Sequence, residues 1–517
     1  MTKIAAGFQS RLGEAAAWYP ARPMAKKILI VGGGIAGLTA GYTLMKQGRD
    51  GARPFEVTIL EAESLPGGGA RAYPVQPRGP DGAELAGEKP FTVEHGSHVF
   101  FKFYDTILKL IAELRADPDP SIGADMPGFS QVPGWTIVDA YGHQATLEQN
   151  PEWVPEPYNV FPSILGMSWL PLVDRLQIGI GSLSLLSRSY DEFGEMDQST
   201  SKELGLASGY SELGLLAWNS ASLGLTNLFI QEQSGALFCA KHKVLIGYPD
   251  GLSYQLPAGD LSKLIADPMK RKLEKLGATF IMEATATGVA RPEGQPRTEV
   301  TFTTPSGGEA TLDADHVILA VPPVVAKGLV PWVSAPWTEL VKVTPVLTVV
   351  MRLSAQLETS TDSHELGLSR EQWAFSVVTD LSHYWPEFQG QGKTVLRCEI
   401  GHADRFPRGA DTPDDEVLEM LQLDLGRLYP EIVARGITIE AYAIHRETNL
   451  LYTRWAKGQW SKKPKERDVG QGVFLTGDWT TKATIGMEAA ANSGIEAANH
   501  VLLAAGLPPV PFRDIPL

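Results

Sequence analysis

The chain has 517 residues, 43% of them hydrophobic and 20% charged, which predicts two or three domains built around a large core. A formal net charge of −15 argues against a nucleic-acid-binding protein, because a phosphate backbone favours clustered Lys and Arg. Cys239 and Cys398 are the only cysteines, and they lie too far apart in sequence for a disulfide framework or a metal motif. We therefore expect a reducing, cytoplasmic compartment and no bound metal.

Residues 1–25 are expected to be an N-terminal extension. They contain charged side chains but no long apolar segment, so no secretory signal is predicted there. Nowhere in the chain is a window of roughly twenty residues free of charges and strong helix breakers, so no transmembrane helix is predicted.

Near the start of the chain, an apolar run of β-branched residues meets a glycine cluster, and a helical pattern follows. Gly32, Gly34 and Gly37 stand in a G-x-G-x-x-G frame. The first glycine allows a tight turn, the second lets a pyrophosphate approach the backbone, and the third lets the helix pack against the strand. Ile35 and Ala36 open the helix, whose N–H groups and positive dipole end favour phosphates.

A second strand is predicted over 55–60, and it ends in the acidic residue Glu61. This carboxylate lies roughly twenty residues beyond the last glycine, where an acid is expected to bind a ribose hydroxyl. The pattern predicts a dinucleotide site. The alternative interpretation is an ordinary glycine-rich turn followed by a surface glutamate.

Residues 61–71, with the sequence EAESLPGGGAR, resemble a segment of the superfamily of FAD-dependent amine oxidases, protoporphyrinogen oxidases and carotenoid desaturases. In that superfamily the second strand ends in Glu-Ala and runs on to Gly-Gly-Arg or Gly-Gly-Lys. Gly69 replaces the basic residue here, and Arg71 follows two positions later. The resemblance implies bound FAD, with Arg71 as the candidate for the pyrophosphate. The matching positions are Glu61, Ala62, Gly67 and Gly68.

Residues 74–90 are rich in Pro, Gly and charge, which indicates an exposed excursion. The next segment, 91–104, resembles the Glu-x-Gly-x-His-Val-Phe-Phe-x-x-Tyr stretch of plant and cyanobacterial phytoene and ζ-carotene desaturases. The resemblance implies that Gly96, Ser97 and His98 pass close to the flavin. His98 is the candidate for proton transfer, because histidine exchanges protons near neutral pH. Alternatively it is a structural histidine.

Residues 116–160 contain many Pro and Gly and are predicted to be irregular, whereas 161–240 show interrupted, strongly apolar helices. The superfamily places an inserted helical domain here, as the roof of its substrate cavity. Such helices suit a long apolar substrate or a peripheral membrane contact. The alternative is simple packing of helix on helix.

A helix ending at Gly277 and a strand over 279–281 mark the return to the flavin-binding domain. The resemblance implies that a backbone position near Val289 meets the adenine. A hairpin is predicted from strands at 298–303 and 310–312. Residues 314–323 resemble the superfamily's Ala-Asp-x-Val-Ile-x-Ala-x-Pro strand.

The inserted domain is expected to continue with strands near 345–353, 395–400 and 437–445 and a helix over 414–428. A final strand then leads to Gly477 and Asp478, and a helix begins near Gly486. The resemblance implies that Asp478 binds the ribityl or pyrophosphate region. It also places the helix end at Gly486 and Met487 by the flavin pyrimidine, where a positive dipole stabilises reduced flavin.

Glu488 follows in this motif and is the second candidate for catalysis. Ala489 stands where desaturases usually have glycine. The first and last motifs belong to one cofactor site but lie at opposite ends of the sequence, so the two ends must form one domain.

Together these features predict an α/β fold, the two-domain, Rossmann-like FAD-binding fold of the amine oxidase type, with an inserted substrate domain of mixed sheet and helices. The expected segments are an N-terminal extension (1–25), three parts of the FAD-binding domain (26–115, 247–330 and 466–517), a substrate or helical cap region (116–246) and a second substrate part (331–465).

Three functions are compatible with this reading. The first is hydride transfer from carbon to flavin N5, with desaturation of an apolar isoprenoid or carotenoid-like substrate. The second is an amine or amino-acid oxidase that makes an imine and hydrogen peroxide, for which Arg454 is a candidate carboxylate-binding group. The third is a non-catalytic prenyl-binding escort protein, against which intact flavin motifs argue. The oligomeric state is left open.

Overall fold

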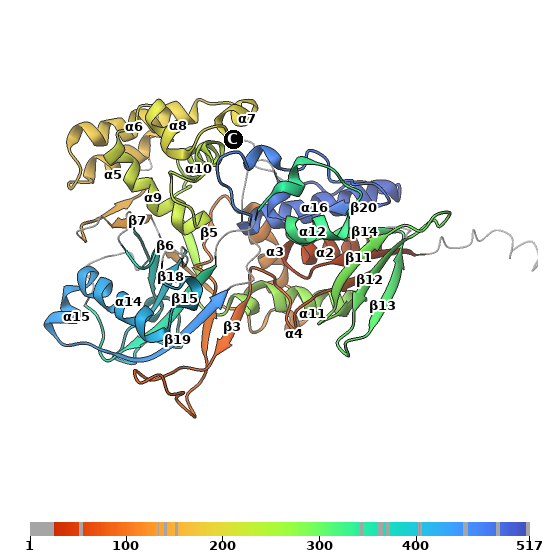
Figure 1. Cartoon of the computed structure of the whole chain (residues 1–517), viewed down its shortest axis with the longest axis horizontal. Coiled ribbons are helices and arrows are strands. Elements are labelled where there is room, and N and C mark those ends of the chain that lie inside the picture. Colours follow the sequence, from red (N-terminus) through yellow and green to blue (C-terminus); the bar gives the residue numbers. More distant parts are fainter. Residues whose placement is uncertain are drawn as a thin grey trace, which may run out of the picture.

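The computed structural model describes residues 25–50, 55–132, 134–138, 142–149, 153–341, 345–358, 365–368, 373–401, 403, 406–447, 453–481 and 486–512. The extension expected at 1–25 lies outside the described residues, except for its last position. Figure 1 shows a lobe with the first and last strands of the chain beside a lobe of later strands, with a layer of helices above the latter.

The first lobe is built on a sheet whose five strands are all parallel. Its strands are short apolar runs with buried side chains, as expected for a sheet covered on both faces. It confirms the expected union of the two chain ends. In spatial order the strands are β10 (Thr279–Ile281), β2 (Phe55–Leu60), β1 (Lys26–Val31), β14 (His316–Leu319) and β20 (Val473–Leu475).

Helices α2 (Ile35–Asp50) and α16 (Gly486–Ala504) pack against one another in this lobe. A glycine permits the contact, since a Cβ atom on Gly494 would lie 2.4 Å from the carbonyl oxygen of Ala36. Helix α11 (Asp267–Leu276) contacts α2 as well and ends at Gly277, which has a φ of 98°. The predicted stop is therefore confirmed.

The predicted hairpin is confirmed as part of a three-stranded antiparallel sheet at the outer end of this lobe. Its strands are β11 (Thr285–Ala290), β12 (Thr298–Thr303) and β13 (Glu309–Ala314).

The second lobe is built on a mixed sheet of seven described strands. Helices α14 (Asp414–Leu428) and α15 (Pro430–Ala434) cover one face and share an apolar core with it. The strands that we predicted near 346, 395 and 439 are confirmed here. In spatial order they are β19 (Ile439–Glu447), β15 (Val346–Leu353), β18 (Val395–Ile400), β17 (Val377–Asp380), β16 (Glu365–Leu368), β7 (Trp135–Val138) and β8 (Gln144–Leu147).

The prediction that 116–160 is irregular is wrong in part, because β6 (Phe129–Val132), β7 and β8 lie there. These strands have four residues each, too few to show a period. Two of them have distant partners, with β7 next to β16 and β6 next to β9 (Tyr254–Pro257), whereas β8 pairs with its neighbour β7. Two-residue β5 (Phe100–Phe101) pairs with the other edge of β9.

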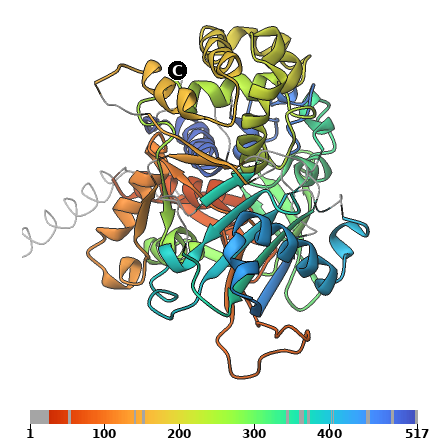
Figure 2. The ribbon, with the colours of Figure 1, turned by 90° about the vertical axis from the view of Figure 1, so that its left-hand side faces the viewer.

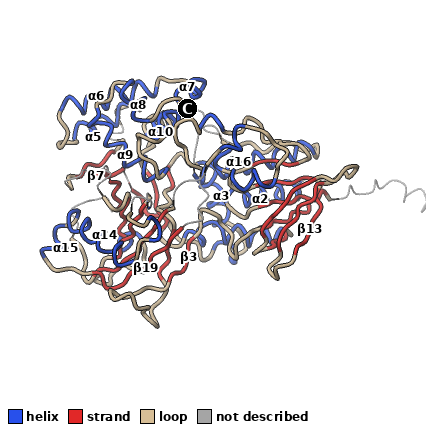
Figure 3. Tube along the Cα trace, viewed as in Figure 1, coloured by secondary structure: helices blue, strands red, loops and turns tan. Residues whose placement is uncertain are grey.

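The helical layer expected at 161–240 is confirmed, and Figures 2 and 3 show it stacked over the seven-stranded sheet. Helix α9 approaches the sheet closely, because a Cβ atom on Gly224 would lie 3.3 Å from Trp135 and 3.4 Å from Val377. The helices are α5 (Phe161–Gly166), α6 (Leu172–Leu186), α7 (Phe193–Met196), α8 (Ser201–Ala207), α9 (Glu212–Thr226) and α10 (Gly235–Leu245).

The remaining elements lie around the two sheets. Residues 76–90 form the expected excursion, between paired strands β3 (Ala72–Val75) and β4 (Phe91–Glu94). Among the described residues, no helix has the length and apolar character needed to cross a bilayer. The other helices are α3 (Asp105–Arg115), α4 (Pro120–Gly123), α12 (Pro323–Leu329) and α13 (Leu381–Tyr384).

Candidate functional site

The motif residues predicted from the two chain ends meet at one edge of the parallel sheet. Because its strands are parallel, β1, β2, β14 and β20 all end at this edge. Gly32, Glu61, Ala320 and Gly477 follow these strands directly or within two residues. Ligands of open α/β sheets bind outside the carboxyl ends of the strands, so this edge is the expected place for a cofactor.

The glycines of the first motif sit where a side chain would collide with backbone. Gly32 has a φ of 105°, and a Cβ atom on it would lie 2.3 Å from the Ala320 carbonyl oxygen. A Cβ atom on Gly37 would lie 2.0 Å from the Gly32 carbonyl oxygen. These contacts hold the turn between β1 and α2 against β14, as the motif predicts.

Gly34 faces a second glycine turn rather than a wall. The Gly67 amide donates to the Gly33 carbonyl at 2.8 Å, and a Cβ atom on Gly34 would lie 3.7 Å from the Cα of Gly68. The first hydrogen bond within α2 runs from the Leu38 amide to the Gly34 carbonyl. The start of α2, at Ile35 and Ala36, thus meets two stretches of bare backbone, which fits a pyrophosphate.

Glu61 is buried at the end of β2. Its Oε2 accepts the Gly33 amide at 2.7 Å, and its Oε1 accepts the Glu63 amide at 2.9 Å. Burial raises the pKa of this carboxyl, and the two amides oppose the rise. The amides fix the carboxylate beside the glycine turn, where a ribose hydroxyl would be bound. Ala62, which follows, is exposed.

The strand position expected to meet the adenine, Val289, lies some distance along its strand from Glu61. The Ala284 amide donates to the Glu61 carbonyl at 2.8 Å, so the start of β11 adjoins the ribose-binding end of β2. Val289 lies five residues further along β11, opposite Val300 of β12, and is buried there. An adenine contact at Val289 stays a prediction, and Ala284, directly before β11, is the residue that lies next to Glu61.

Arg71 lies next to the Gly67–Gly68 turn, but its guanidinium already has protein partners. Its Nε donates to the Tyr73 hydroxyl at 2.9 Å, and Nη1 donates to the Leu65 carbonyl at 3.2 Å. A pyrophosphate contact through Arg71 stays a prediction.

The last motif forms the other half of the edge. The Gly477 amide donates to Ser493 Oγ at 3.0 Å, which ties the end of β20 to α16. Burial raises the pKa of Asp478, opposed first by the charge of Lys463. Gly486 opens α16 with a φ of 73°, and Met487 behind it is buried. The positive end of this helix faces the same edge, as expected for stabilising a reduced flavin.

Glu488 does not point into this edge. Its fully buried carboxylate accepts the Thr106 amide at Oε1 and the Ile107 amide at Oε2, both at 2.9 Å. These amides belong to the first turn of α3, so the carboxylate caps that helix. Burial raises its pKa to about 7. We therefore assign Glu488 to holding α3 against α16, in place of proton transfer.

The segment after β4 contacts the second lobe through a buried charged network. Arg397 of β18 donates from Nη1 to Glu94 at 3.1 Å and from Nη2 to Ser97 Oγ at 2.7 Å. Glu399 lies on the same face of β18, and its pKa is raised by burial. A Cβ atom on Gly96 would lie 3.4 Å from its carboxylate. The loop with Gly96, Ser97 and His98, which we expect beside the flavin, is thus held against the inserted domain by hydrogen bonds.

His98 is nearly buried at this network. Its Nδ1 lies 3.6 Å from Glu94 Oε2, outside hydrogen-bond distance, and has no hydrogen-bond partner among the described residues. If His98 were a structural histidine, the alternative interpretation, this buried nitrogen would be expected to have a hydrogen-bond partner. His98 therefore keeps its candidacy for proton transfer.

Sequence reasoning missed Arg397 and Glu399, although a signal was present. They alternate within the strand Val395–Ile400, whose other side chains are apolar, so both charges fall on one face of a buried strand. It also missed Gly33, whose amide binds Glu61. A backbone donor leaves no trace in the side-chain pattern.

The comparisons with known proteins agree with this geometry. The model of one family, described as flavin containing amine oxidoreductase, matches residues 35–502. The chain belongs to this family. As a flavin-containing oxidoreductase it takes FAD, and the glycine turns, Glu61 and the start of α16 supply a cradle that fits a dinucleotide.

Among relatives, zeta-carotene desaturase of Arabidopsis thaliana is 24% identical over 524 residues, which cover 92% of this chain and 85% of that protein. Carotenoid phi-ring synthase of Chlorobaculum tepidum is 24% identical over 278 residues, but the match spans only 39% of its length and 52% of this chain. The solved structure of cyclohexylamine oxidase from Brevibacterium oxydans has the same fold, with a TM-score of 0.62 at 17% identity over 93% of this chain and all of that chain.

Gly34→Ala should weaken FAD binding without unfolding the protein. The added methyl group would make only ordinary contacts with the protein, at 3.7 Å or more, but it would occupy the surface left for the pyrophosphate. We expect the dissociation constant of FAD to rise about tenfold or more, measured by flavin titration of the stripped protein. Gly194→Ala, at a position with open space around it, is the control. Equal affinities would place the pyrophosphate elsewhere.

Glu488→Gln should change how stability depends on pH. Burial raises the pKa of this carboxyl to about 7 in the folded protein, against an ordinary value of 4.5, so the folded protein holds a proton that the unfolded chain releases between these values. This stabilisation is complete below pH 4.5 and is lost as the pH rises through 7. From about pH 5 to about pH 8 the wild type should lose roughly 2 kcal/mol of unfolding free energy relative to the variant.

The measurement is urea unfolding followed by tryptophan fluorescence at several pH values. The amide adds a cost that does not depend on pH, so only the difference in slope reports the carboxyl. Parallel curves for the two proteins would show that Glu488 has an ordinary pKa.

Proposed function

We propose that this flavoprotein desaturates an apolar, isoprenoid or carotenoid-like substrate. The observation that carries the proposal is an aromatic path from the start of α16 to an apolar cavity. Tyr104 Oη lies 3.5 Å from the position of a Cβ atom on Gly486, and its ring meets Phe101 with centroids 5.6 Å apart. Phe101 in turn lies parallel to Trp135, with centroids 6.4 Å apart, and Trp135 lines the cavity.

This path suits a hydrocarbon and not a charged amine or amino acid. Phe101, Tyr104 and Trp135 are all buried, and the rings exclude water from the space beside them. Arg454, the candidate group for a substrate carboxylate, instead forms an ion pair with Glu232 at 2.7 Å. The zeta-carotene desaturases that match nearly the whole chain support the same substrate class.

The protein's own residues would bind, orient and take up the proton. FAD, when bound, supplies the hydride acceptor at N5. The aromatic path aligns the chain of the substrate and keeps its reacting carbons dry. His98 accepts the proton that leaves the neighbouring carbon at Nε2, the ring nitrogen away from Glu94, and Glu94, 3.6 Å from Nδ1, stabilises the resulting charge. Arg397 holds Glu94 in place.

The proposal predicts which compounds reduce the flavin. Under anaerobic conditions, micellar phytoene or ζ-carotene should bleach the flavin absorbance and yield a product with one more double bond. A panel of amines and amino acids, in the same micelles, should leave the absorbance unchanged. Bleaching by an amine alone would instead make the protein an amine oxidase.

A substrate of this kind resides in membranes, and we propose that α6 contacts the bilayer. Its outer face is a stripe of exposed aliphatic side chains, whereas Ile178 and Ser182 on its inner face line the cavity. Solvent-exposed apolar residues at this spacing are typical of helices that lie in a membrane surface. The exposed fractions are 60% for Leu172, 66% for Val173, 52% for Leu176 and 60% for Ile180.

Vesicle flotation tests this contact. The wild type should float with neutral phosphatidylcholine vesicles, and the double variant Leu176→Asp, Ile180→Asp should remain at the bottom of the gradient, because it would bury two charges. Leu423→Asp is the control. Leu423 is 66% exposed, but it lies on α14, which covers a face of the seven-stranded sheet, and not on α6. Flotation of the double variant, or no flotation of the wild type, would contradict the proposal.

A further inference from the structure

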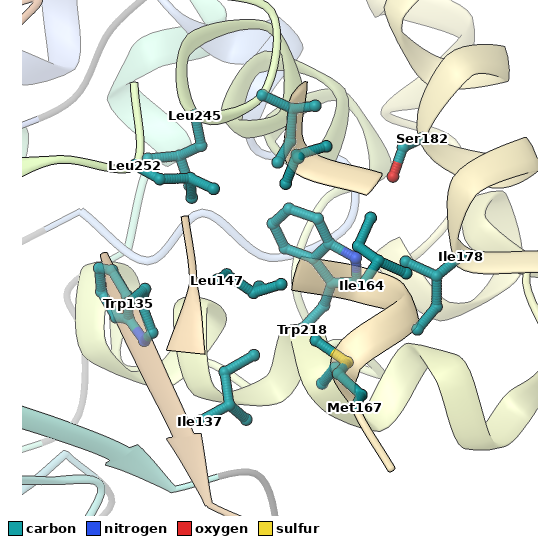
Figure 4. Close-up of a pocket in the computed structure, with 13 residues that line it drawn as sticks. Trp135, Ile137, Leu147, Ile164, Met167, Ile178, Ser182, Trp218, Leu245 and Leu252 are labelled. Carbon is teal, nitrogen blue, oxygen red and sulfur yellow. The ribbon is translucent and has the colours of Figure 1, made fainter. Parts of the chain in front are cut away.

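A small cavity lies between the helical layer and strands β7 and β8, with a volume of about 20 Å³ (Figure 4). Its wall is almost wholly apolar. Among the thirteen lining residues, Ser182 carries the one hydroxyl group, and the two indole N–H groups of Trp135 and Trp218 are the other polar side-chain atoms. At this volume the cavity has room for about one or two heavy atoms, such as the terminal carbon and oxygen of an alcohol, and not for a whole isoprenoid.

Ser182 is the outer member of a buried hydrogen-bond cluster. Its Oγ lies 2.6 Å from the hydroxyl of Tyr210. That hydroxyl also lies 2.7 Å from His242 Nε2 and 3.1 Å from Trp218 Nε1. All four residues are buried. Tyr210 has one proton to give and two lone pairs, so the direction of each bond can be assigned.

The assignment starts from His242. Its Nδ1 lies 2.8 Å from the Phe238 carbonyl oxygen, which can only accept, so Nδ1 carries a proton. Burial lowers the pKa of His242 to about 3, so the ring is neutral and Nε2 is an acceptor. Tyr210 therefore donates its one proton to Nε2.

With that proton used, the other two partners of Tyr210 must donate to it. The Trp218 indole N–H is always a donor, and Ser182 consequently directs its O–H toward Tyr210 as well. The side of Ser182 Oγ that faces the cavity has only lone pairs. The cavity thus presents one acceptor, and no free donor from this cluster, within an apolar wall.

We propose that this cavity receives the hydroxyl-bearing end of an apolar chain, which donates its O–H to Ser182. A ketone, aldehyde or ether cannot donate and would set oxygen against oxygen. A water molecule needs two to four polar partners, whereas the cluster offers one. The inference rests on the proposed function in one respect: the rest of the chain would have to pass between the packed rings of Trp135, Phe101 and Tyr104 to reach the flavin.

The test compares a C20 alcohol, geranylgeraniol, with its aldehyde, geranylgeranial, which differs only in the ability to donate. Dissociation constants are measured for the oxidised flavoprotein in matched micelles under anaerobic conditions, without turnover. The alcohol should bind about tenfold more tightly than the aldehyde, as one buried hydrogen bond would give.

Three variants locate the preference. Ser182→Ala should abolish it, and Ser184→Ala, on the same helix but outside the cavity lining, should retain it. Tyr210→Phe removes the acceptor of the Ser182 proton, so Ser182 can then donate into the cavity and the aldehyde should gain on the alcohol. A general loss of structure would weaken both ligands together and would not reverse their order.

Equal affinity of alcohol and aldehyde for the wild type would overturn the inference, as would failure of both to bind. A preference that persists in Ser182→Ala would also overturn it. These outcomes are independent of flavin bleaching. A protein that prefers the alcohol but is bleached by no polyene would retain the inferred binding site and lose the proposed desaturation.

Discussion

The flavin-binding half of this protein depends on contact between backbones at one edge of a parallel sheet. The turn after β1 touches the end of β14 so closely that Gly32 has no room for a methyl group, and Gly37 touches the same turn from the helix side. The second glycine turn, at Gly67 and Gly68, is hydrogen-bonded to the first. These contacts set the start of α2 and the carboxylate of Glu61 at fixed positions. The cofactor site is therefore made of main chain more than of side chains.

Local signals made much of the fold predictable. The glycine frame, the stop at Gly277 and the helix Asp414–Leu428 each depend on residues that are neighbours in sequence, and the structure confirms them. The four-residue strands β7 and β8 were missed because each is too short to show an alternating pattern, although they pair with each other as neighbours in sequence, and only β7 has a distant partner, β16. The backbone position that meets the adenine was less predictable, because a main-chain contact leaves no trace in the side-chain pattern and the chain passes Glu61 through an irregular turn in which Glu283 adopts a φ of 53°.

The site was less predictable where it depends on pairs of distant charges. Glu94 and Arg397 are separated by 303 positions, and neither one alone distinguishes a buried pair from a solvated side chain. Burial of this pair brings a desolvation cost that only good geometry offsets. The network also fixes the loop that we expect beside the flavin against the sheet of the inserted domain. The expected cofactor edge and the inserted domain therefore keep a fixed relative position. Glu488 is the opposite case. Its motif suggested a place next to the flavin, but its carboxylate instead caps α3.

The packing of α16 on α2, made possible by Gly494, has a consequence for the order in which the protein matures. Because β1 and α2 precede β20 and α16 in the chain, the ribosome makes them first. Until α16 packs on α2, the nascent chain has the glycine turn expected to bind the pyrophosphate but lacks the helix end expected beside the flavin ring. Domains usually fold as units during synthesis. Here the parallel sheet is interrupted twice in sequence, so the two halves of its cofactor edge can meet only after β20 and α16 have been made.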